Sequence, residues 1–213
     1  MERVSSSDSM LFNSSLHGDI EGVITALAQG GKVTVRNPDG FTPLLAAAQN
    51  GHTDICALLL THGSNVHDLN HNGFTPLLVA VDNGHTDISE LLLAHGSSVN
   101  EVTPHKKTAL HKAAGHGNNA LVEVLLSWGA EVNSQESRDS HGWGEWTPLH
   151  IACQEGHMLC VLTLLKAGAS LTLPNSEGAL PIHLAALHNR LDIVTTLLAH
   201  GCSPDMVTYQ TQS

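Results

Sequence analysis

The segment Thr147-Pro148-Leu149-His150-Ile151-Ala152 decides the fold, because versions of it recur at a fixed interval along the chain. Its threonine has counterparts at four other places, which are Thr42, Thr75, Thr108 and Leu180. A second column consists of glycines, namely Gly30, Gly63, Gly96, Gly129, Gly168 and Gly201. Both columns repeat every 33 residues, except for one interval of 39 that contains a six-residue insertion. This regularity predicts a stack of small repeated folding units.

The pattern resembles the ankyrin repeat, a 33-residue unit with the hallmark Thr-Pro-Leu-His-x-Ala, which residues 147–152 match in full. The resemblance covers residues 8–205 and predicts six repeats at 8–40, 41–73, 74–106, 107–145 (with the insertion within 134–145), 146–178 and 179–205. It implies an all-α solenoid of helix-turn-helix units with projecting loops or short β-hairpins. Residues 1–7 are expected to be a flexible segment, and 206–213 a polar tail.

The residues of the second repeat support this interpretation independently. Thr42 is suited to cap a helix, and Pro43 fits the first helical turn, where its missing N–H costs nothing. Gly51 is expected to end that short helix. Asp54 then favours the start of a second helix, and Gly63 takes the left-handed position after it.

The two ends of the array differ in character. Asn13, Ser14 and Ser15 stand where the second repeat has three alanines, which predicts a polar outer cap. The last repeat keeps an apolar helix of the internal type, with Ile193 and Leu197, and shows no capping helix. We therefore expect that the chain is a fragment, or that a partner covers this repeat.

Composition narrows the class of protein. Only 3% of the 213 residues are aromatic, so the core must consist of Leu, Ile, Val and Ala, as in stacked helices. The formal net charge of -11 argues against nucleic acids and anionic membranes as partners. The chain has no 18-residue apolar run and no signal peptide, and its four cysteines form no Cys-x-x-Cys pair. These features favour a cytoplasmic or nuclear protein that is monomeric alone.

Sixteen histidines raise the question of a metal site. Twelve of them occupy four columns of the repeat, and residues one repeat apart lie about 10 Å from each other. That spacing is too wide for one zinc ion, whose bonds are about 2 Å long. We expect structural roles and no metal. The histidines of the Thr-Pro-Leu-His column, His111, His150 and His183, are expected to be neutral, with a lowered pKa.

No arrangement of residues points to catalysis. The chain lacks a nucleophile elbow, a P-loop, a dinucleotide fingerprint and a His-Glu-x-x-His motif. We expect neither an enzyme nor a cofactor. The prediction is a non-catalytic module that binds a partner protein or peptide. The alternative is a substrate-recruiting or regulatory part of a larger multidomain signalling enzyme.

The resemblance also implies where partners bind, namely on a concave face built from loop tips and inner helices. Carried over position by position, the contact residues are Arg36, Asp39, Phe41, Gln49, Asn50, Leu69, His71, Asn72, Phe74, Asp82, Asn83, His105, Lys107, His116, Trp143, Trp146, Gln154, Glu155, Leu187 and His188. Acidic and aromatic residues among them favour a partner with apolar and basic side chains.

Two features within the fourth repeat leave alternatives open. Trp143 in the insertion is either an exposed interface anchor or a side chain that folds back over the wider gap. Asn133, with Leu125 and Glu131, has the spacing that ankyrin repeats present to an asparaginyl hydroxylase. It is otherwise a loop asparagine that bonds neighbouring backbone.

Overall fold

The computed structural model describes residues 5–137 and 144–203, and every regular element in these ranges is a helix. The twelve helices are α1 (Ser6–His17), α2 (Ile20–Ala28), α3 (Pro43–Asn50), α4 (Thr53–Thr61), α5 (Pro76–Asp82), α6 (Thr86–Ala94), α7 (Ala109–His116), α8 (Asn119–Ser127), α9 (Pro148–Glu155), α10 (Met158–Lys166), α11 (Pro181–Leu187) and α12 (Leu191–Ala199). The prediction of an all-α fold of helix pairs is confirmed.

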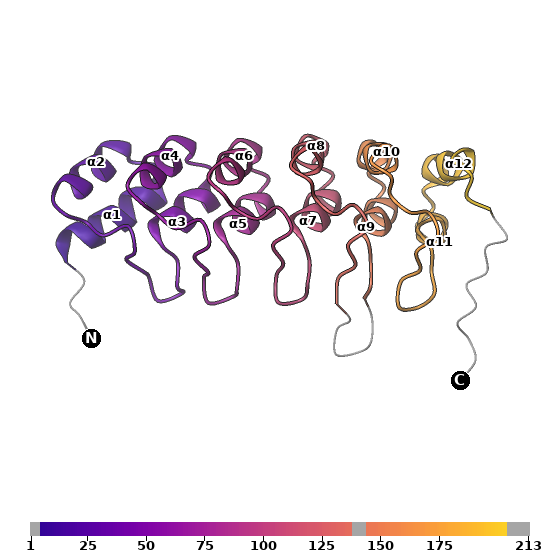
Figure 1. Ribbon diagram of the computed structural model, residues 1–213, viewed down its shortest axis with the longest axis horizontal. Coiled ribbons are helices and arrows are strands. Elements are labelled where there is room, and N and C mark those ends of the chain that lie inside the picture. Colours follow the sequence, from indigo (N-terminus) through magenta and orange to yellow (C-terminus); the bar gives the residue numbers. More distant parts are fainter. Residues whose placement is uncertain (1–4, 138–143, 204–213) are drawn as a thin grey trace. The chain divides into compact units, whose positions relative to one another are not determined.

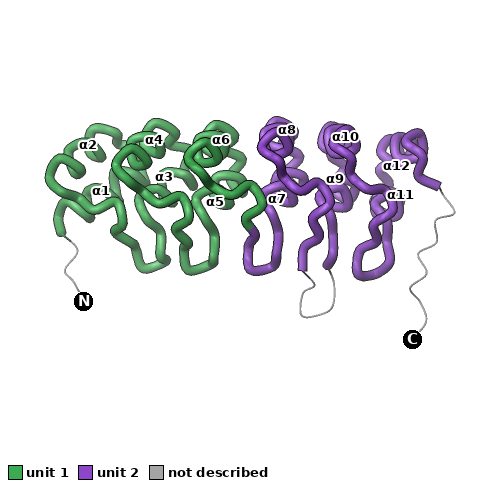
Figure 2. Tube along the Cα trace, viewed as in Figure 1, with its two compact units in different colours: residues 1–101 green, residues 102–213 purple. Residues whose placement is uncertain are grey.

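The chain divides into two compact units, unit 1 (Met1–Glu101) and unit 2 (Val102–Ser213), shown in Figure 2. Within unit 1, the inner helices α1, α3 and α5 pack in one layer and the outer helices α2, α4 and α6 in a second (Figure 1). Unit 2 repeats this arrangement, with α7, α9 and α11 inside and α8, α10 and α12 outside. In each unit the loops project from the inner layer.

Local signals set the ends of the inner helices. Thr42 and Thr147 accept hydrogen bonds from the amides of Leu45 and His150 at 3.3 and 3.4 Å, as N-caps do. Gly51 ends α3 in the left-handed conformation. Helices of seven to nine residues are unstable alone, so burial against neighbouring repeats must stabilise them. None of the described helices is long and apolar enough to cross a bilayer.

The first repeat departs from expectation. Helix α1 begins at Ser6 with Ser5 as its cap, inside the segment 1–7 that we expected to be flexible. Ser14 and Ser15 are buried, so they do not form a polar outer face; only Asn13 is exposed. Burial is tolerated because the Ser15 hydroxyl donates to the Leu11 carbonyl at 2.8 Å and that of Ser14 to the Asp19 carboxylate at 3.3 Å.

In the last repeat, Ile193 and Leu197 are fully buried, whereas Leu198 is 39% exposed. The inner side of α12 is thus packed like the inner side of an outer helix in an internal repeat. Whether this repeat is covered by a partner stays a prediction.

Candidate functional site

In each of three loops, an asparagine side chain accepts hydrogen bonds from two backbone amides of the same loop. The Oδ1 atom of Asn175 accepts from the amides of Glu177 and Ala179 at 3.0 and 2.8 Å. Asn37 and Asn70 make the same pair of bonds in their own loops. These bonds hold each turn, and they fix the residues at its tip.

The turn itself needs a left-handed backbone, which Gly40, Gly73 and Gly178 supply. In unit 2 this glycine column is broken, because Lys106 and Glu145 adopt φ values of 55° and 58° at the equivalent positions. An L residue in this conformation is strained by about 1–2 kcal/mol. Two neighbouring loops therefore carry charged side chains where glycine would be more stable.

We expect Lys106→Gly and Glu145→Gly each to raise the free energy of unfolding by about 1 kcal/mol, since relieved strain exceeds the added chain entropy. Chemical denaturation measures the effect. Lys166→Gly is a matched control in the regular backbone of α10, where glycine should cost about 1 kcal/mol. A loss of stability in all three variants would contradict the inference that the backbone is strained at Lys106 and Glu145.

An open hollow of about 510 Å³ lies on the loop side of unit 2. Five of the residues predicted to contact a partner line it: His105, Lys107, Trp146, Gln154 and Glu155. Sequence reasoning missed its other lining residues, which are Glu136, Ser137, Gly144 and Ile151. The structure thus gathers predicted residues of the third, fourth and fifth repeats around one cavity.

Gly115 on α7 lies against Ile151, one of the residues that line the hollow. The equivalent inner-helix positions carry Gln49, Asp82, Gln154 and Leu187, whereas Gly115 has no side chain. A Cβ atom built at Gly115 would come within 3.2 Å of the Ile151 Cγ2 atom, so a side chain here would project toward Ile151. The absent side chain is a signal in the sequence that distinguishes this repeat from the others.

Hydrogen bonds to the backbone carbonyl of Trp146 fix this residue at the edge of the hollow. Its carbonyl oxygen accepts from His111 Nε2–H at 2.9 Å and from the Glu136 amide at 3.1 Å. Its half-buried ring lies 6.3 Å from the imidazole of His150, between centroids. The indole therefore offers a fixed apolar surface to a ligand.

Charged side chains of opposite sign lie on different sides of the hollow. Lys107 Nζ lies 3.1 Å from Glu136 Oε2, and the lysine is 42% exposed while the glutamate is 11% exposed. Glu155 is exposed, and its Oε1 accepts from the Gln154 amide at 3.0 Å. A paired cation thus lies on the α7 side and an exposed carboxylate at the end of α9.

The described residues at the root of the insertion are tied to the loops on both sides. Gln135 Nε2 donates to the carbonyls of Glu145 and Pro174 at 2.8 and 3.0 Å. The Ser137 amide donates to His105 O at 3.0 Å, and the Gly144 amide to Ser176 Oγ at 2.9 Å. Both neighbouring loops therefore fix this root. Trp143 lies outside the described residues, so both interpretations of it stay open.

Two histidines are buried beneath the hollow and lack a positive charge at neutral pH. Burial lowers the pKa of both His111 and His150 to about 4. His150 Nε2–H donates to Ala179 O at 3.1 Å, and its Nδ1 accepts from the Thr147 hydroxyl and amide. The expected lowering thus holds for these two residues, but desolvation is its main cause, and not the helix dipole. His183 is only half-buried.

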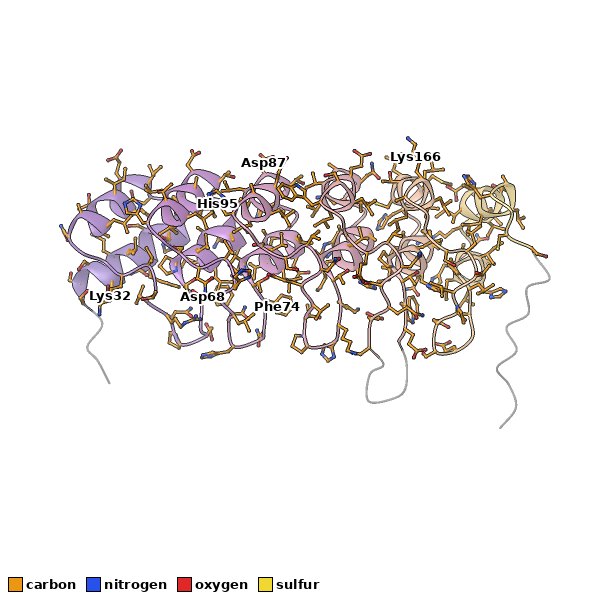
Figure 3. The ribbon with its side chains drawn as sticks, viewed as in Figure 1. Lys32, Asp68, Phe74, Asp87, His95 and Lys166 are labelled. Carbon is orange, nitrogen blue, oxygen red and sulfur yellow. The ribbon has the colours of Figure 1, made fainter. Side chains whose placement is uncertain are left out.

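In unit 1, several predicted contact residues are engaged in the fold. The Arg36 guanidinium donates to Gly40 O and Leu69 O at 2.7 Å each, and to Asp68 Oδ1 at 2.8 Å. It therefore connects its own loop to the next one, which carries Asp68 and Leu69; Figure 3 labels Asp68. The Asn50 and Asn83 amides donate to carbonyls of their own helices at 2.9 and 2.8 Å.

The remaining predicted contact residues are dispersed. Phe41 and Phe74 are half-buried, so both a packing and a binding role remain open. Gln49, Leu69, His71, Asn72 and Asp39 are exposed in unit 1, where Asp82 is half-buried, and His116, Leu187 and His188 are exposed in unit 2 outside the lining of the hollow.

Asn133 is exposed, and both ends of its amide bond the next loop: Nδ2 donates to Gly168 O at 3.4 Å, and Oδ1 accepts from the Ser170 amide at 2.8 Å. These bonds fit a structural asparagine. Its hydroxylation stays a prediction.

Comparison with known proteins gives a consistent result. A family model described as ankyrin repeats (3 copies) matches residues 11–103, 67–136 and 136–208. BCL-6 corepressor-like protein 1 of Homo sapiens is 33% identical over 76 residues, which are 36% of this chain and 4% of that protein. SH3 and multiple ankyrin repeat domains protein 2, also from Homo sapiens, is 32% identical over 76 residues, with the same shares.

A putative palmitoyltransferase, ZDHHC13 of Danio rerio, is 38% identical over 60 residues, which are 28% of this chain and 9% of that protein. The chain thus matches less than a tenth of the length of each of these three relatives.

Proposed function

Because this chain belongs to the ankyrin repeat family, whose members are generally non-catalytic protein-interaction modules, we propose that it holds a peptide segment of a partner protein in the hollow of unit 2. One observation carries the proposal: five residues predicted to contact a partner line a single open cavity with an apolar wall. The cavity volume of about 510 Å³ is within the range of ligand sites.

The lining suggests the chemistry of the bound segment. Trp146 and Ile151 offer an apolar wall for one aliphatic or aromatic side chain. Glu155, exposed nearby, would attract a lysine or arginine. Glu136 is already paired with Lys107 and contributes no free charge. We therefore expect a segment in which an apolar residue stands close to a basic one.

The root of the insertion supports a rigid site. Its hydrogen bonds to the loops on both sides fix Gly144, which lines the hollow. A preformed cavity loses little entropy when a peptide binds, which favours affinity.

A display library of unstructured peptides, selected on the whole protein, tests this function. We expect enrichment of an apolar residue next to Lys or Arg. Trp146→Ala should weaken the selected peptides about thirtyfold, corresponding to about 2 kcal/mol. Trp128→Ala is the matched control, because Trp128 is 44% exposed at the end of α8 and does not line the hollow.

Gly115→Gln provides a second variant, which places the side chain found at Gln49 and Gln154 against Ile151 in the wall of the hollow. It should weaken binding as strongly as Trp146→Ala and preserve the helices, since glutamine favours a helix more than glycine does. Equal affinity in the wild type and both variants would reject the hollow as the site.

The match to a putative palmitoyltransferase favours one alternative, a substrate-recruiting repeat array within a larger enzyme. In that case the hollow would hold a segment of the enzyme's substrate. Mass spectrometry of the natural protein, isolated from its source, distinguishes the two: a joined catalytic domain supports the alternative.

A further inference from the structure

Helix α10 differs from the other outer helices at two solvent-facing positions. At the register of Leu159 the other outer helices carry Glu21, Asp54, Asp87, Ala120 and Asp192. At the register of Leu162 they carry Ile24, Ala57, Glu90, Glu123 and Thr195. Leu159 and Leu162 are 66% and 41% exposed, one helical turn apart. Two leucines thus face solvent where most repeats place a charge or a small residue.

A hollow of about 420 Å³ adjoins this apolar face where α10 meets the end of α12. Leu162, Thr163, Leu165, Lys166 and His200 line it. It lies on the outer layer of unit 2, and it shares no lining residue with the hollow on the loop side.

The lining of this hollow carries a cation, Lys166, in an otherwise acidic chain. Lys166 stands in the last turn of α10 and projects from the outer layer of unit 2 (Figure 3). The His200 Nδ1 atom is hydrogen-bonded to Thr196 O at 2.8 Å. Asp192 is the nearest acidic residue of α12, and it lies in the first turn, away from His200. One end of the surface is therefore basic.

We propose that Leu159, Leu162, Leu165, Lys166 and His200, the α10 surface, dock an amphipathic helix of a partner protein that carries apolar side chains and a carboxylate. Leucines three residues apart form a ridge beside a groove between two helices, the relief into which a third helix packs. The carboxylate lies against Lys166 and His200. The chain's net charge of -11 repels such a helix from the other outer faces and makes this position selective.

A display library of helical peptides with one randomised face, selected on the whole protein, tests the proposal. We expect peptides with leucine-like residues at i, i+3 and i+4 and a Glu or Asp at one end. Leu159→Asp with Leu162→Glu installs the residues that α6 carries at this register, Asp87 and Glu90, so the fold is retained. This double variant should weaken the peptides at least about thirtyfold.

Two further variants sharpen the test. Ile24→Glu is the matched control, because Ile24 is 46% exposed on α2 at the register of Leu162; it should leave affinity unchanged. Lys166→Glu should weaken binding about tenfold and reduce its salt dependence. Circular dichroism of each variant verifies that the helices are intact.

Three results would overturn the proposal. They are a library that yields no binder, binders that tolerate the Leu159/Leu162 double variant, and binders that are basic. Sedimentation equilibrium gives a fourth: a wild-type dimer that the double variant abolishes would make a second copy the occupant of the α10 surface. Because the two hollows share no residue, failure here leaves the loop-side function untouched.

Discussion

Lowering the pH from about 7.5 to about 5 should destabilise unit 2 by about 4 kcal/mol in total and leave unit 1 nearly unchanged. The cause is the pair His111 and His150, whose pKa burial lowers to about 4, against about 6.5 in an unfolded chain. The unfolded state therefore binds more protons between these values, and stability is lost as pH falls from about 6.5 towards 4.

Geometry explains why the folded ring resists the proton. In each histidine Nε2–H already donates to a carbonyl oxygen of the next loop, Trp146 O or Ala179 O. A second proton would have to enter at Nδ1, where a threonine hydroxyl and amide already donate. Protonation breaks these bonds as well as charging a buried group.

Unit 1 provides an internal control, since Phe12, Leu45 and Leu78 occupy this column there. Asp8 in unit 1 has a lowered pKa, through its bonds to the amide of Lys32 and to Ser5, so its contribution is lost only below about pH 4. Hydrogen exchange at both pH values separates the two units. All three tryptophans lie in unit 2, so their fluorescence follows its unfolding.

The double variant His111→Leu with His150→Leu should remove the pH dependence, because leucine occupies the same position in two repeats of unit 1. A denaturation midpoint of the wild type that stays constant between pH 7.5 and about 5 would contradict the prediction. Unfolding of unit 1 before unit 2 as the pH falls would also contradict the prediction.

Asn175→Ala should lower the free energy of unfolding by about 3 kcal/mol. The side chain is 2% exposed, and its Oδ1 atom alone satisfies the amides of Glu177 and Ala179. Alanine leaves both amides without this acceptor and loosens the loop whose Ala179 carbonyl accepts from His150. Urea denaturation of the variant, followed by circular dichroism, measures the loss.

Asn175→Asp is the matched control because it keeps the acceptor oxygen, and two amide donors stabilise a carboxylate. We expect it to retain most of the stability that alanine loses. If both variants lost the same amount, the packing of the side chain, and not its hydrogen bonds, would hold the loop.

The sequence by itself determined the repeat, its pair of helices and the signals that cap the inner helices, although it did not place the start of α1 at Ser6. These features depend on local chemistry: Thr42 and Thr147 cap helices with their own side chains, and Gly51 reverses the chain through its own backbone freedom. Periodicity then placed every repeat, since the same residues recur at the same distance. The resemblance to ankyrin repeats, carried over by register, implied His105, Lys107, Trp146, Gln154 and Glu155 as contact residues.

The tertiary structure decided which of these residues share a cavity, because that depends on neighbours distant in sequence. The hollow brings His105, Ser137 and Glu155 together, although they lie far apart in the sequence. Arg36 had the register of a contact residue, yet its guanidinium is used by the adjacent loop. The position of Arg36 in the repeat cannot predict this engagement, because it depends on the Asp68 carboxylate and the Leu69 carbonyl in the next loop.

Burial was likewise fixed by packing. His111, His150 and His183 share one position in the repeat, but only the first two are buried. Each of these two donates to a carbonyl of the following loop, and burial lowers its pKa to about 4. Ser14 and Ser15 face inward for the same kind of reason: their hydroxyls find partners one turn or one loop away. Sequence sets the local conformation of each repeat, whereas desolvation and cavities arise only where repeats meet.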